Sequence, residues 1–312
     1  MQATEPWVCV LGASNMDLLT KVPRLPKLGE TLIGRFFHLG CGGKGANQAV
    51  MARKLGARVT MITKLGRDMF GEYIFRNYQQ QGIDTTYVLW DEQRFSGVAP
   101  IFVDDEGRNM IVIVPGANFG LTPEDVHRAR EAITRADVVV CQLEVPLEVT
   151  AEALRLAKQD GRALTIFNPA PGQPLPQELV RLSDVIAPNE TEAEAITGLP
   201  IRDLPHAESA ARQLLATGAG AAIITLGERG ALVADPAGVT LAPAIPVKAV
   251  DSTGAGDAFI GTLAYFLAQG APLRRGVHLA NAAAAISVTR VGTQVSFPWR
   301  AELDAFLETL PQ

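Results

Sequence analysis

The chain has 312 residues, of which 47% are hydrophobic and 20% charged, and its formal net charge is −5. The high apolar content excludes a disordered protein, the aperiodic glycines exclude a collagen, and the absence of long heptad runs excludes a coiled coil. No apolar run is long enough for a membrane span, no secretory leader is evident, and no Lys/Arg stripe suits a nucleic acid. Three widely spaced cysteines read as free thiols of a reducing compartment. We therefore expect a cytoplasmic protein that acts on a small molecule, with no membrane or nucleic-acid partner.

Short apolar, β-branched runs alternate with helical patterns along most of the chain. Runs typical of buried parallel strands occupy residues 7–13, 57–66, 137–144, 162–170, 185–190 and 221–227. Helical patterns lie between them: one opens with Thr122 as N-cap and Pro123 in the first turn, and others cover 146–158, 178–182 and 258–269 or begin near Leu273. This alternation predicts the α/β class, with a doubly wound, mostly parallel sheet flanked by helices.

Two segments, residues 17–39 and 97–115, break this alternation. Each reads as strands separated by turn residues, and the second reads as a hairpin with its tip at residues 104–107. Because neither segment contains the crossover helix that a parallel connection needs, we expect a small antiparallel β lid that stands off the main sheet. The alternative is two surface hairpins without functional consequence. Residues 1–312 are expected to form a single domain that carries this lid.

The stretch Asp-Ser-Thr-Gly-Ala-Gly-Asp at residues 251–257 comes directly before a helical pattern. Unpaired N–H groups at a helix start and the glycines Gly254 and Gly256 suit an anionic ligand. A carboxylate at Asp257 would repel a phosphate, so it makes sense as a general base that takes a proton from an attacking hydroxyl. The alternative is that Asp257 only favours the helix start and the glycines only turn the chain. No Walker A loop and no dinucleotide fingerprint is present.

A glycine-rich stretch, Gly-Cys-Gly-Gly-Lys-Gly-Ala-Asn-Gln-Ala at residues 40–49, precedes an apolar helix that runs to about Leu55. The glycines allow a ligand to lie against bare backbone, and Lys44 and Asn47 offer donors to hydroxyl or carbonyl oxygens. A sugar needs many such directed hydrogen bonds. The alternative is a glycine-rich turn with a solvated lysine.

Polar residues follow several predicted strands, at the edge where α/β proteins bind ligands. Asn15 and Asp17 follow the first strand and suit vicinal hydroxyls, although such residues are usually turn formers. Glu144 ends a strand in the same layer, where it could also be a solvated strand end.

Two further segments at this edge suit a nucleotide or a metal. Asn189 either caps the helix after its strand or, with Glu192, organises a hydrated Mg²⁺. The segment 225–230 joins two strands and could equally be a tight turn.

Taken together, these stretches resemble the ribokinase branch of the PfkB carbohydrate kinase family over essentially the whole chain. The stretches GGKGANQA and DSTGAGD correspond to the two signatures of this family, in the same order and at a similar separation. The resemblance implies a ribokinase-like fold and ATP-dependent phosphorylation of D-ribose to D-ribose 5-phosphate. It also implies Mg²⁺ with ATP, K⁺ as a monovalent activator, and a homodimer formed through the β lid.

The resemblance also implies roles for individual residues. Asp257 would be the general base, and the anion hole would consist of Gly254, Ala255 and Gly256. Ribose would be held, together with Asp257, by Asn15, Asp17, Gly43, Lys44, Asn47 and Glu144. ATP would contact Asn189, Thr225, Leu226, Gly227, Glu228, Arg229, Gly230, Gly256 and Asn281. K⁺ would lie among Asp251, Thr253, Ser287, Arg290, Gly292 and Ser296, and Glu192 would help to place Mg²⁺ indirectly. Asn281 stands where some family members carry histidine.

Other functions remain open at this point. One alternative is another PfkB-family kinase, acting on deoxyribose, fructose or a nucleoside. Another is a non-catalytic sugar sensor on the same fold, which would be expected to lose the base or the glycine loop; the chain has lost neither. An NAD-dependent dehydrogenase would need a fingerprint that the sequence lacks.

Overall fold

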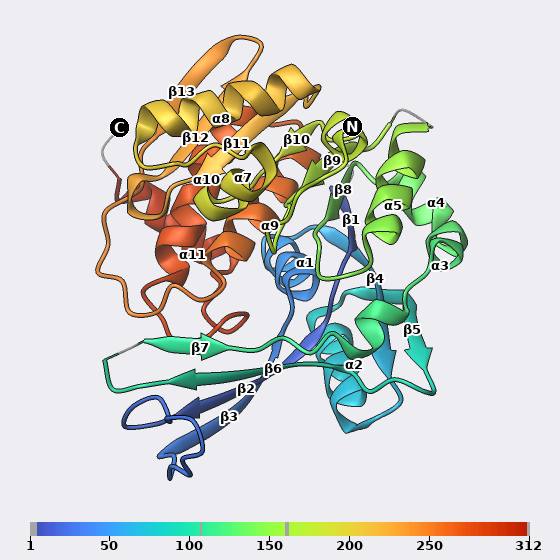
Figure 1. Ribbon diagram of the computed structural model, residues 1–312. Coiled ribbons are helices and arrows are strands. Elements are labelled where there is room, and N and C mark those ends of the chain that lie inside the picture. Colours follow the sequence, from blue (N-terminus) through green and yellow to red (C-terminus); the bar gives the residue numbers. More distant parts are fainter. Residues whose placement is uncertain (1–4, 107, 160–161, 311–312) are drawn as a thin grey trace.

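The computed structural model describes residues 5–106, 108–159 and 162–310, and within these ranges the chain folds around two sheets (Figure 1). In the described residues the larger sheet has nine strands in the order β13-β12-β11-β10-β9-β8-β1-β4-β5. These are β1 (Trp7–Leu11), β4 (Arg58–Gly66), β5 (Asp84–Asp91), β8 (Val138–Cys141), β9 (Leu164–Phe167), β10 (Val185–Ile186), β11 (Ala221–Thr225), β12 (Ala231–Asp235) and β13 (Gly238–Ala242). All neighbours are parallel except β11-β12 and β12-β13 at one edge. The predicted mostly parallel sheet is confirmed.

Helices cover both faces of this sheet, because side chains of one strand alternate between two cores. Val8 and Val10 of β1 point to one core, and Cys9 and Leu11 point to the other. The first core is covered by α1 (Lys44–Lys54), α2 (Met69–Gln81), α9 (Ala255–Ala268), α10 (Leu273–Ser287) and α11 (Arg300–Glu308). The second is covered by α3 (Pro123–Arg128), α4 (Arg130–Arg135), α5 (Leu147–Gln159), α6 (Gln177–Arg181), α7 (Glu190–Thr197) and α8 (Leu204–Thr217). None of the helices in the described ranges is long and apolar enough to cross a membrane.

The smaller sheet projects from the body below α11 (Figure 1). Its strands are β2 (Asn15–Lys21), β3 (Phe36–Gly42), β6 (Gly97–Val103) and β7 (Asn109–Ile111), in the order β3-β2-β6-β7. The predicted sheet is thus present, with two antiparallel pairs, β2-β3 and β6-β7. Its central pair, β2 and β6, is parallel, which the expectation of an antiparallel lid did not include. Gly107 of the predicted hairpin tip lies outside the described residues.

The parallel pair in the lid has a simple origin in the order of the chain. Between β2 and β6 the chain passes through α1 and α2 and two strands of the large sheet. These elements supply the long crossover that parallel neighbours require. Antiparallel pairing is left to the direct connections that contain no helix, β2 to β3 and β6 to β7.

Helix starts follow the local chemistry of the sequence. The Thr122 hydroxyl accepts a hydrogen bond from the Asp125 N–H, the Asp125 carboxylate caps Thr122 in return, and Pro123 occupies the first turn of α3. Helix α5 begins at Leu147 and α6 at Gln177, each one residue from its predicted start. The predicted helix after residue 257 begins slightly earlier, at Ala255.

Candidate active site

The polar residues predicted at strand ends gather along one edge of the large sheet. Asn15 follows β1, Glu144 follows β8, Asn189 follows β10 and Thr225 ends β11. All these strands run parallel, so their carboxyl ends lie at the same edge. Helix α1 begins at this edge and packs against α9 (Figure 1). The two glycine-rich motifs of the sequence therefore meet where α/β proteins bind ligands.

Asp257 is the point of contact between the two motifs. It lies in the first turn of α9 with 6% of its surface exposed. Its Oδ2 accepts a hydrogen bond of 2.9 Å from Asn47 Nδ2, and its Oδ1 accepts one of 3.0 Å from Gln48 Nε2. Both donors come from α1. The carboxylate is consequently held in one orientation by two amide groups.

A network of buried amides supports these two donors. Gln48 Nε2 also donates to Asn168 Oδ1 at 3.1 Å, while Gln48 Oε1 accepts from Gln142 Nε2 at 2.6 Å. Gln294 Nε2 donates to Asn47 Oδ1 at 3.1 Å. None of these supporting amides was predicted to be a site residue: Gln48, Gln142, Asn168 and Gln294. Gln48 lies inside a motif and Gln142 and Asn168 follow strands, so only Gln294 gave no local signal.

The start of α9 presents free backbone donors. Gly254 caps the helix with a φ of 80°, a left-handed conformation that favours glycine. The Ala255 N–H donates to the Ser252 carbonyl at 3.2 Å, whereas within the described residues the N–H groups of Gly256 and Asp257 have no backbone or side-chain partner. A Cβ on Gly256 would meet nothing within 4 Å. Two N–H groups at the positive end of a helix dipole thus lack a partner among the described residues, as an anion site requires.

Carboxylates and one lysine line the side of the site nearest the lid. Asp17 lies on β2 against Gly42, where a Cβ would come within 2.3 Å of its carboxylate oxygens. Burial, together with repulsion from Glu144 and Asp257, raises the pKa of Asp17 to about 7. Burial also raises the pKa of Glu144, whose Oε2 accepts a hydrogen bond of 2.9 Å from the Lys44 N–H.

Lys44 balances this negative charge. Burial alone would lower the pKa of its ammonium group. Attraction from Asp257, Glu144 and Glu192 outweighs burial, so the pKa of Lys44 is raised above its ordinary value. The ammonium group therefore stays protonated among the carboxylates.

The remaining residues assigned to the sugar lie at the base of the lid. Asn15 begins β2 with 2% of its surface exposed, and its Oδ1 accepts a hydrogen bond of 2.8 Å from Asn118 Nδ2. Gly43 is the N-cap of α1. Asn118, in the 3₁₀ helix η1 (Gly116–Gly120), is fully buried and was not among the predicted site residues.

Asn189 and Glu192 form the helix cap that the sequence analysis kept open as the alternative to a metal site. Asn189 Oδ1 accepts from the Glu192 N–H at 2.8 Å, and Glu192 Oε2 accepts from the Asn189 N–H at 2.8 Å. Burial raises the pKa of Glu192, which is one of the three carboxylates that act on Lys44. The cap thus leaves Glu192 close enough to the site to interact with its charged groups.

The other residues assigned to ATP lie beside this cap. Thr225 forms a β-bridge with Asn189, and the following chain turns through η2 (Gly227–Arg229), where Leu226 N–H bonds to the Gly230 carbonyl at 2.8 Å. Asn281 lies on α10, and its Nδ2 donates to the Ala242 carbonyl at 3.1 Å and the Pro243 carbonyl at 3.2 Å. A Cβ on Gly230 would lie 2.1 Å from the same Ala242 oxygen. The structure therefore brings the predicted ATP residues into one region.

The two segments assigned to a monovalent cation also meet. Asp251 Oδ1 accepts hydrogen bonds from the Thr253 N–H at 2.9 Å and from the Thr253 hydroxyl at 2.6 Å. Asp251 Oδ2 accepts a hydrogen bond from the Gly292 N–H at 2.9 Å. The Ser287 and Ser296 hydroxyls donate to the Ala284 and Thr293 carbonyls, and the Arg290 guanidinium pairs with Glu302. The Asp251 carboxylate thus joins the loop before α9 to the chain after α10. Within the described chain no group of three or more His, Cys, Asp or Glu residues could hold a metal ion by itself.

Comparison with known proteins identifies the family. The model of the pfkB family carbohydrate kinases matches residues 6–300. A Salmonella typhi deoxyribokinase is 42% identical over 301 residues, covering 96% of this chain and 98% of that protein. A mouse ribokinase is 42% identical over 302 residues, covering 95% and 93%. The structure of an Arabidopsis thaliana ribokinase complexed with ribose and ATP superposes with a TM-score of 0.89, at 28% identity over 98% of this chain and 99% of that one. With both signature motifs meeting at Asp257, the chain belongs to the pfkB family of carbohydrate kinases and is an ATP-dependent sugar kinase.

Proposed function

We propose that the enzyme phosphorylates D-ribose at its terminal hydroxyl and releases D-ribose 5-phosphate and ADP. One observation carries this proposal: a buried carboxylate, Asp257, is held by two amides directly beside two free N–H groups at the start of α9. A base and an anion site within one helical turn suit the transfer of a phosphoryl group to a hydroxyl.

The chemistry needs few groups. Asp257 takes the proton of the sugar hydroxyl while the hydroxyl oxygen attacks the γ-phosphorus, and the bond between that phosphorus and ADP breaks. The N–H groups of Gly256 and Asp257, with the Gly254–Gly256 turn, stabilise the negative charge on the transferred group. Glu192 would hold Mg²⁺ through water, and this ion would supply positive charge against the phosphates of ATP. Lys44 remains protonated among the acids and adds positive charge.

On the sugar side, donors and acceptors surround the proposed sugar position. They belong to Asn15, Asp17, Lys44, Asn47 and Glu144. Gly43 contributes backbone at the start of α1. On the other side, Asn189, the segment 225–230 and Asn281 contact ATP. The alternative sugar substrate is 2-deoxy-D-ribose, which is supported by the 42% identity to a deoxyribokinase.

A panel assay separates these substrates. ADP release is measured with D-ribose, 2-deoxy-D-ribose, D-fructose and nucleosides, and the phosphorylated carbon is located by phosphorus–proton NMR. We expect the highest kcat/KM for D-ribose, phosphate at carbon 5, and a kcat lowered by about 10² to 10⁴ in Asp257→Asn. A preference for another sugar would replace ribose in the proposal. Sugar binding without ADP release would identify a sensor instead of an enzyme.

We propose that K⁺ activates the enzyme through the cluster of Asp251, Thr253, Ser287, Arg290, Gly292 and Ser296. The support is the link between Asp251 and Gly292, which ties the loop before α9 to the chain after α10. A cation there would fix the backbone donors of the anion hole without touching substrate. Initial rates are compared in potassium and tetramethylammonium buffers at equal ionic strength, for wild type and Asp251→Ala. Equal wild-type rates in the two buffers would contradict the proposal.

We propose that residues 1–312 form a single domain that carries the lid. We also propose a homodimer in which the lids of two subunits pack together. The support is apolar surface on both edges of the lid: Phe36 is 54% and Phe37 59% exposed on β3, and Met110 48% and Ile111 45% on β7. Analytical ultracentrifugation should give twice the mass of the chain, and Phe37→Asp should give monomers. A monomeric wild type would contradict this.

We further propose that the enzyme works in the cytoplasm. Cys9 and Cys141 are buried free thiols, and Cys41 is a free thiol whose burial, together with Asp17, raises its pKa to about 12. None of these thiols is activated, which is consistent with a reducing compartment. Fluorescence of a tagged chain in its host cell tests the location.

A further inference from the structure

Asn118 is a buried side chain whose hydrogen bonds are unusually well determined. It lies in η1 with none of its surface exposed. Its Oδ1 accepts from the Ser14 N–H at 2.9 Å. Its Nδ2 faces three acceptors: the Pro115 carbonyl at 2.9 Å, the Ser14 carbonyl at 3.1 Å and Asn15 Oδ1 at 2.8 Å.

These backbone partners leave only one orientation for the amide. A backbone N–H can only donate, so the Asn118 atom facing the Ser14 N–H must be the oxygen. Backbone carbonyls can only accept, so the atom facing Pro115 and Ser14 must be the NH₂ group. The Asn15 atom facing that NH₂ group must in turn be an acceptor, Oδ1. Asn118 therefore fixes Asn15 as well.

Asn15 is left with its donor available. Within the described residues, Asn15 Nδ2 makes no hydrogen bond, while Asn15 Oδ1 is occupied by Asn118. Asp17 lies two residues further along β2, so its side chain points to the same face of the strand. Side by side, the two residues offer an N–H donor and a carboxyl acceptor.

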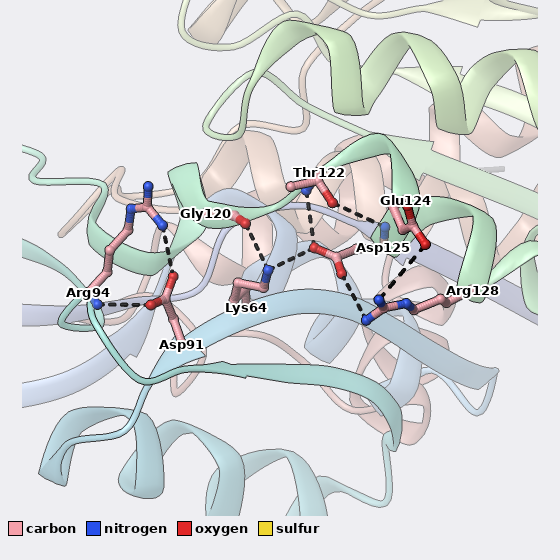
Figure 2. A network of polar contacts seen from close by, with 8 residues as sticks. All are labelled: Lys64, Asp91, Arg94, Gly120, Thr122, Glu124, Asp125 and Arg128. Atoms are coloured by element: carbon pink, nitrogen blue, oxygen red, sulfur yellow. Dashed lines mark hydrogen bonds and ion pairs between the residues drawn. The ribbon is translucent and has the colours of Figure 1, made fainter.

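The segment that carries Asn118 is held firmly from two sides. Figure 2 shows Lys64 of β4 between Gly120 and Asp125: its Nζ donates to the Gly120 carbonyl and to Asp125 Oδ2, both at 2.7 Å. Only 15% of the Lys64 side chain and 6% of the Asp125 side chain are exposed. On the other side, a Cβ on Gly97 would lie 2.2 Å from both Asn118 Nδ2 and Asn15 Oδ1. The first residue of β6 is thus a glycine where the amide pair occupies the space of a side chain.

We propose that Asn118 is a positioning residue that fixes Asn15 as a hydrogen-bond donor toward the sugar. The inference rests on the proposed function, in which Asn15 and Asp17 contact sugar hydroxyls. A hydroxyl both accepts and donates, so it can accept from Asn15 while it or its neighbour donates to Asp17. A ligand group that only donates can bond to Asp17 but not to Asn15, and a group that only accepts can bond to Asn15 but not to Asp17. The orientation of Asn15 therefore selects a hydroxylated ligand.

The test removes the NH₂ donor of Asn118 with little change in the shape of the side chain. In Asn118→Asp the new carboxylate still accepts from the Ser14 N–H but cannot donate to Asn15 Oδ1. Asn15 then turns its NH₂ group toward the carboxylate and presents oxygen to the sugar. We expect the KM for the sugar to rise at least about tenfold, the usual effect of a mismatched buried hydrogen bond. The kcat at saturating sugar and the KM for ATP stay within about threefold of wild type.

A double-mutant cycle with Asn15→Ala separates positioning from a purely structural effect. If Asn118 acts through Asn15, Asn118→Asp changes the sugar KM by less than about threefold once Asn15 is alanine, in keeping with the loss of coupling. The same fold loss in both backgrounds would overturn the inference. If Asn15→Ala alone left the sugar KM unchanged, the placement of the sugar in the proposed function would fail instead.

A second variant covers the case in which Asn118→Asp does not fold. Asn118→Ser keeps a small polar group and frees Asn15 to turn in either direction, so the sugar KM should rise less than in Asn118→Asp. In the double-mutant cycle this smaller rise should also disappear once Asn15 is alanine. Thermal unfolding is measured for every variant. A sugar KM that follows the loss of melting temperature, with no dependence on Asn15, would also overturn the proposal.

Discussion

The two halves of the candidate site are built in different ways. On the sugar half, buried side chains dominate: Asn15 is 2%, Asn47 4% and Asp257 6% exposed, and each is held by a neighbouring amide. On the nucleotide half, Gly227, Glu228 and Arg229 are exposed, and the best-defined contacts are those of the main chain at Leu226, Gly230 and Ala242.

This difference indicates how selectivity is divided. Buried amides have fixed donor and acceptor positions and lose much when one partner is missing, so they can discriminate between similar sugars. An exposed turn built from backbone offers the same hydrogen bonds whatever its side chains are. We therefore expect side-chain substitutions to matter on the sugar half and main-chain geometry to matter on the nucleotide half.

The largest effect is expected from Asp257→Asn. The amide keeps the size of the side chain but cannot take a proton, so kcat should fall by about 10² to 10⁴. Sugar affinity, measured by calorimetry, should change little. Turnover within threefold of wild type would remove Asp257 from its proposed role. Asp304→Asn, at a half-exposed position on α11, serves as the control.

Asp17→Ala tests the sugar half directly. Loss of a charged hydrogen-bond partner in a closed site costs about 1.5–3 kcal/mol, so kcat/KM for the sugar should fall by about 10- to 150-fold. Because Asp17 lies on β2, far along the chain from the nucleotide segments, ATP affinity should not change. An equal loss for ATP would indicate general misfolding and weaken the comparison.

A matched pair of substitutions tests the nucleotide half. In Gly230→Ala the new Cβ would lie 2.1 Å from the Ala242 carbonyl oxygen, at a residue whose φ is 97°. The turn must therefore move, and this displacement of the main chain should raise the KM for ATP about tenfold. Arg229→Ala removes an exposed ion pair with Glu190 and should change the KM for ATP less than about twofold. Reversal of this order would mean that side chains, not backbone, hold the nucleotide.

The smallest effect concerns stability. In an unfolded chain an aspartate ionises near pH 4, whereas burial, Glu144 and Asp257 raise the pKa of folded Asp17 to about 7. Between these values the folded protein holds a proton that the unfolded chain has lost, so stability falls as pH rises, and the loss levels off above the folded pKa. Asp17→Asn removes this penalty.

The stabilisation of the sugar-free protein by Asp17→Asn should therefore be about 1 kcal/mol larger at pH 8.5 than at pH 6. Urea unfolding at the two pH values measures it, with Asp105→Asn in the exposed lid tip as the control. Equal stabilisation at both pH values would contradict the raised pKa.

Local sequence patterns predicted most of the large sheet. Strands with continuous apolar runs, such as β1 and β8, and helices with explicit start signals, such as Thr122 before α3, were placed within a few residues. Strand β5 was not predicted, because its sequence DTTYVLWD mixes polar and apolar residues at the edge of the sheet. The parallel pairing of β2 with β6 depends on elements between them and has no local signal.

The site likewise contains residues that a local motif predicts and residues that no local motif predicts. Asp257, Lys44 and Asn47 stand in glycine-rich motifs, and their meeting follows from two helices that begin at one sheet edge. Asn118 and Gln294 stand in no such motif, and their importance depends on contacts with Asn15 and Asn47 that are distant in the sequence. A lone asparagine in a loop could not be distinguished from a turn former.

The parallel pairing inside the lid also has a consequence for the order of assembly during synthesis. Residues 15–21 cannot find their neighbours at residues 97–103 until the intervening chain has emerged, and a two-stranded β2-β3 hairpin is only marginally stable alone. Closing so long a loop is entropically costly unless α1, β4, α2 and β5 have already folded and shortened it. The lid should thus be among the later parts of the N-terminal half to form, and its unpaired strands remain open to chaperones until then.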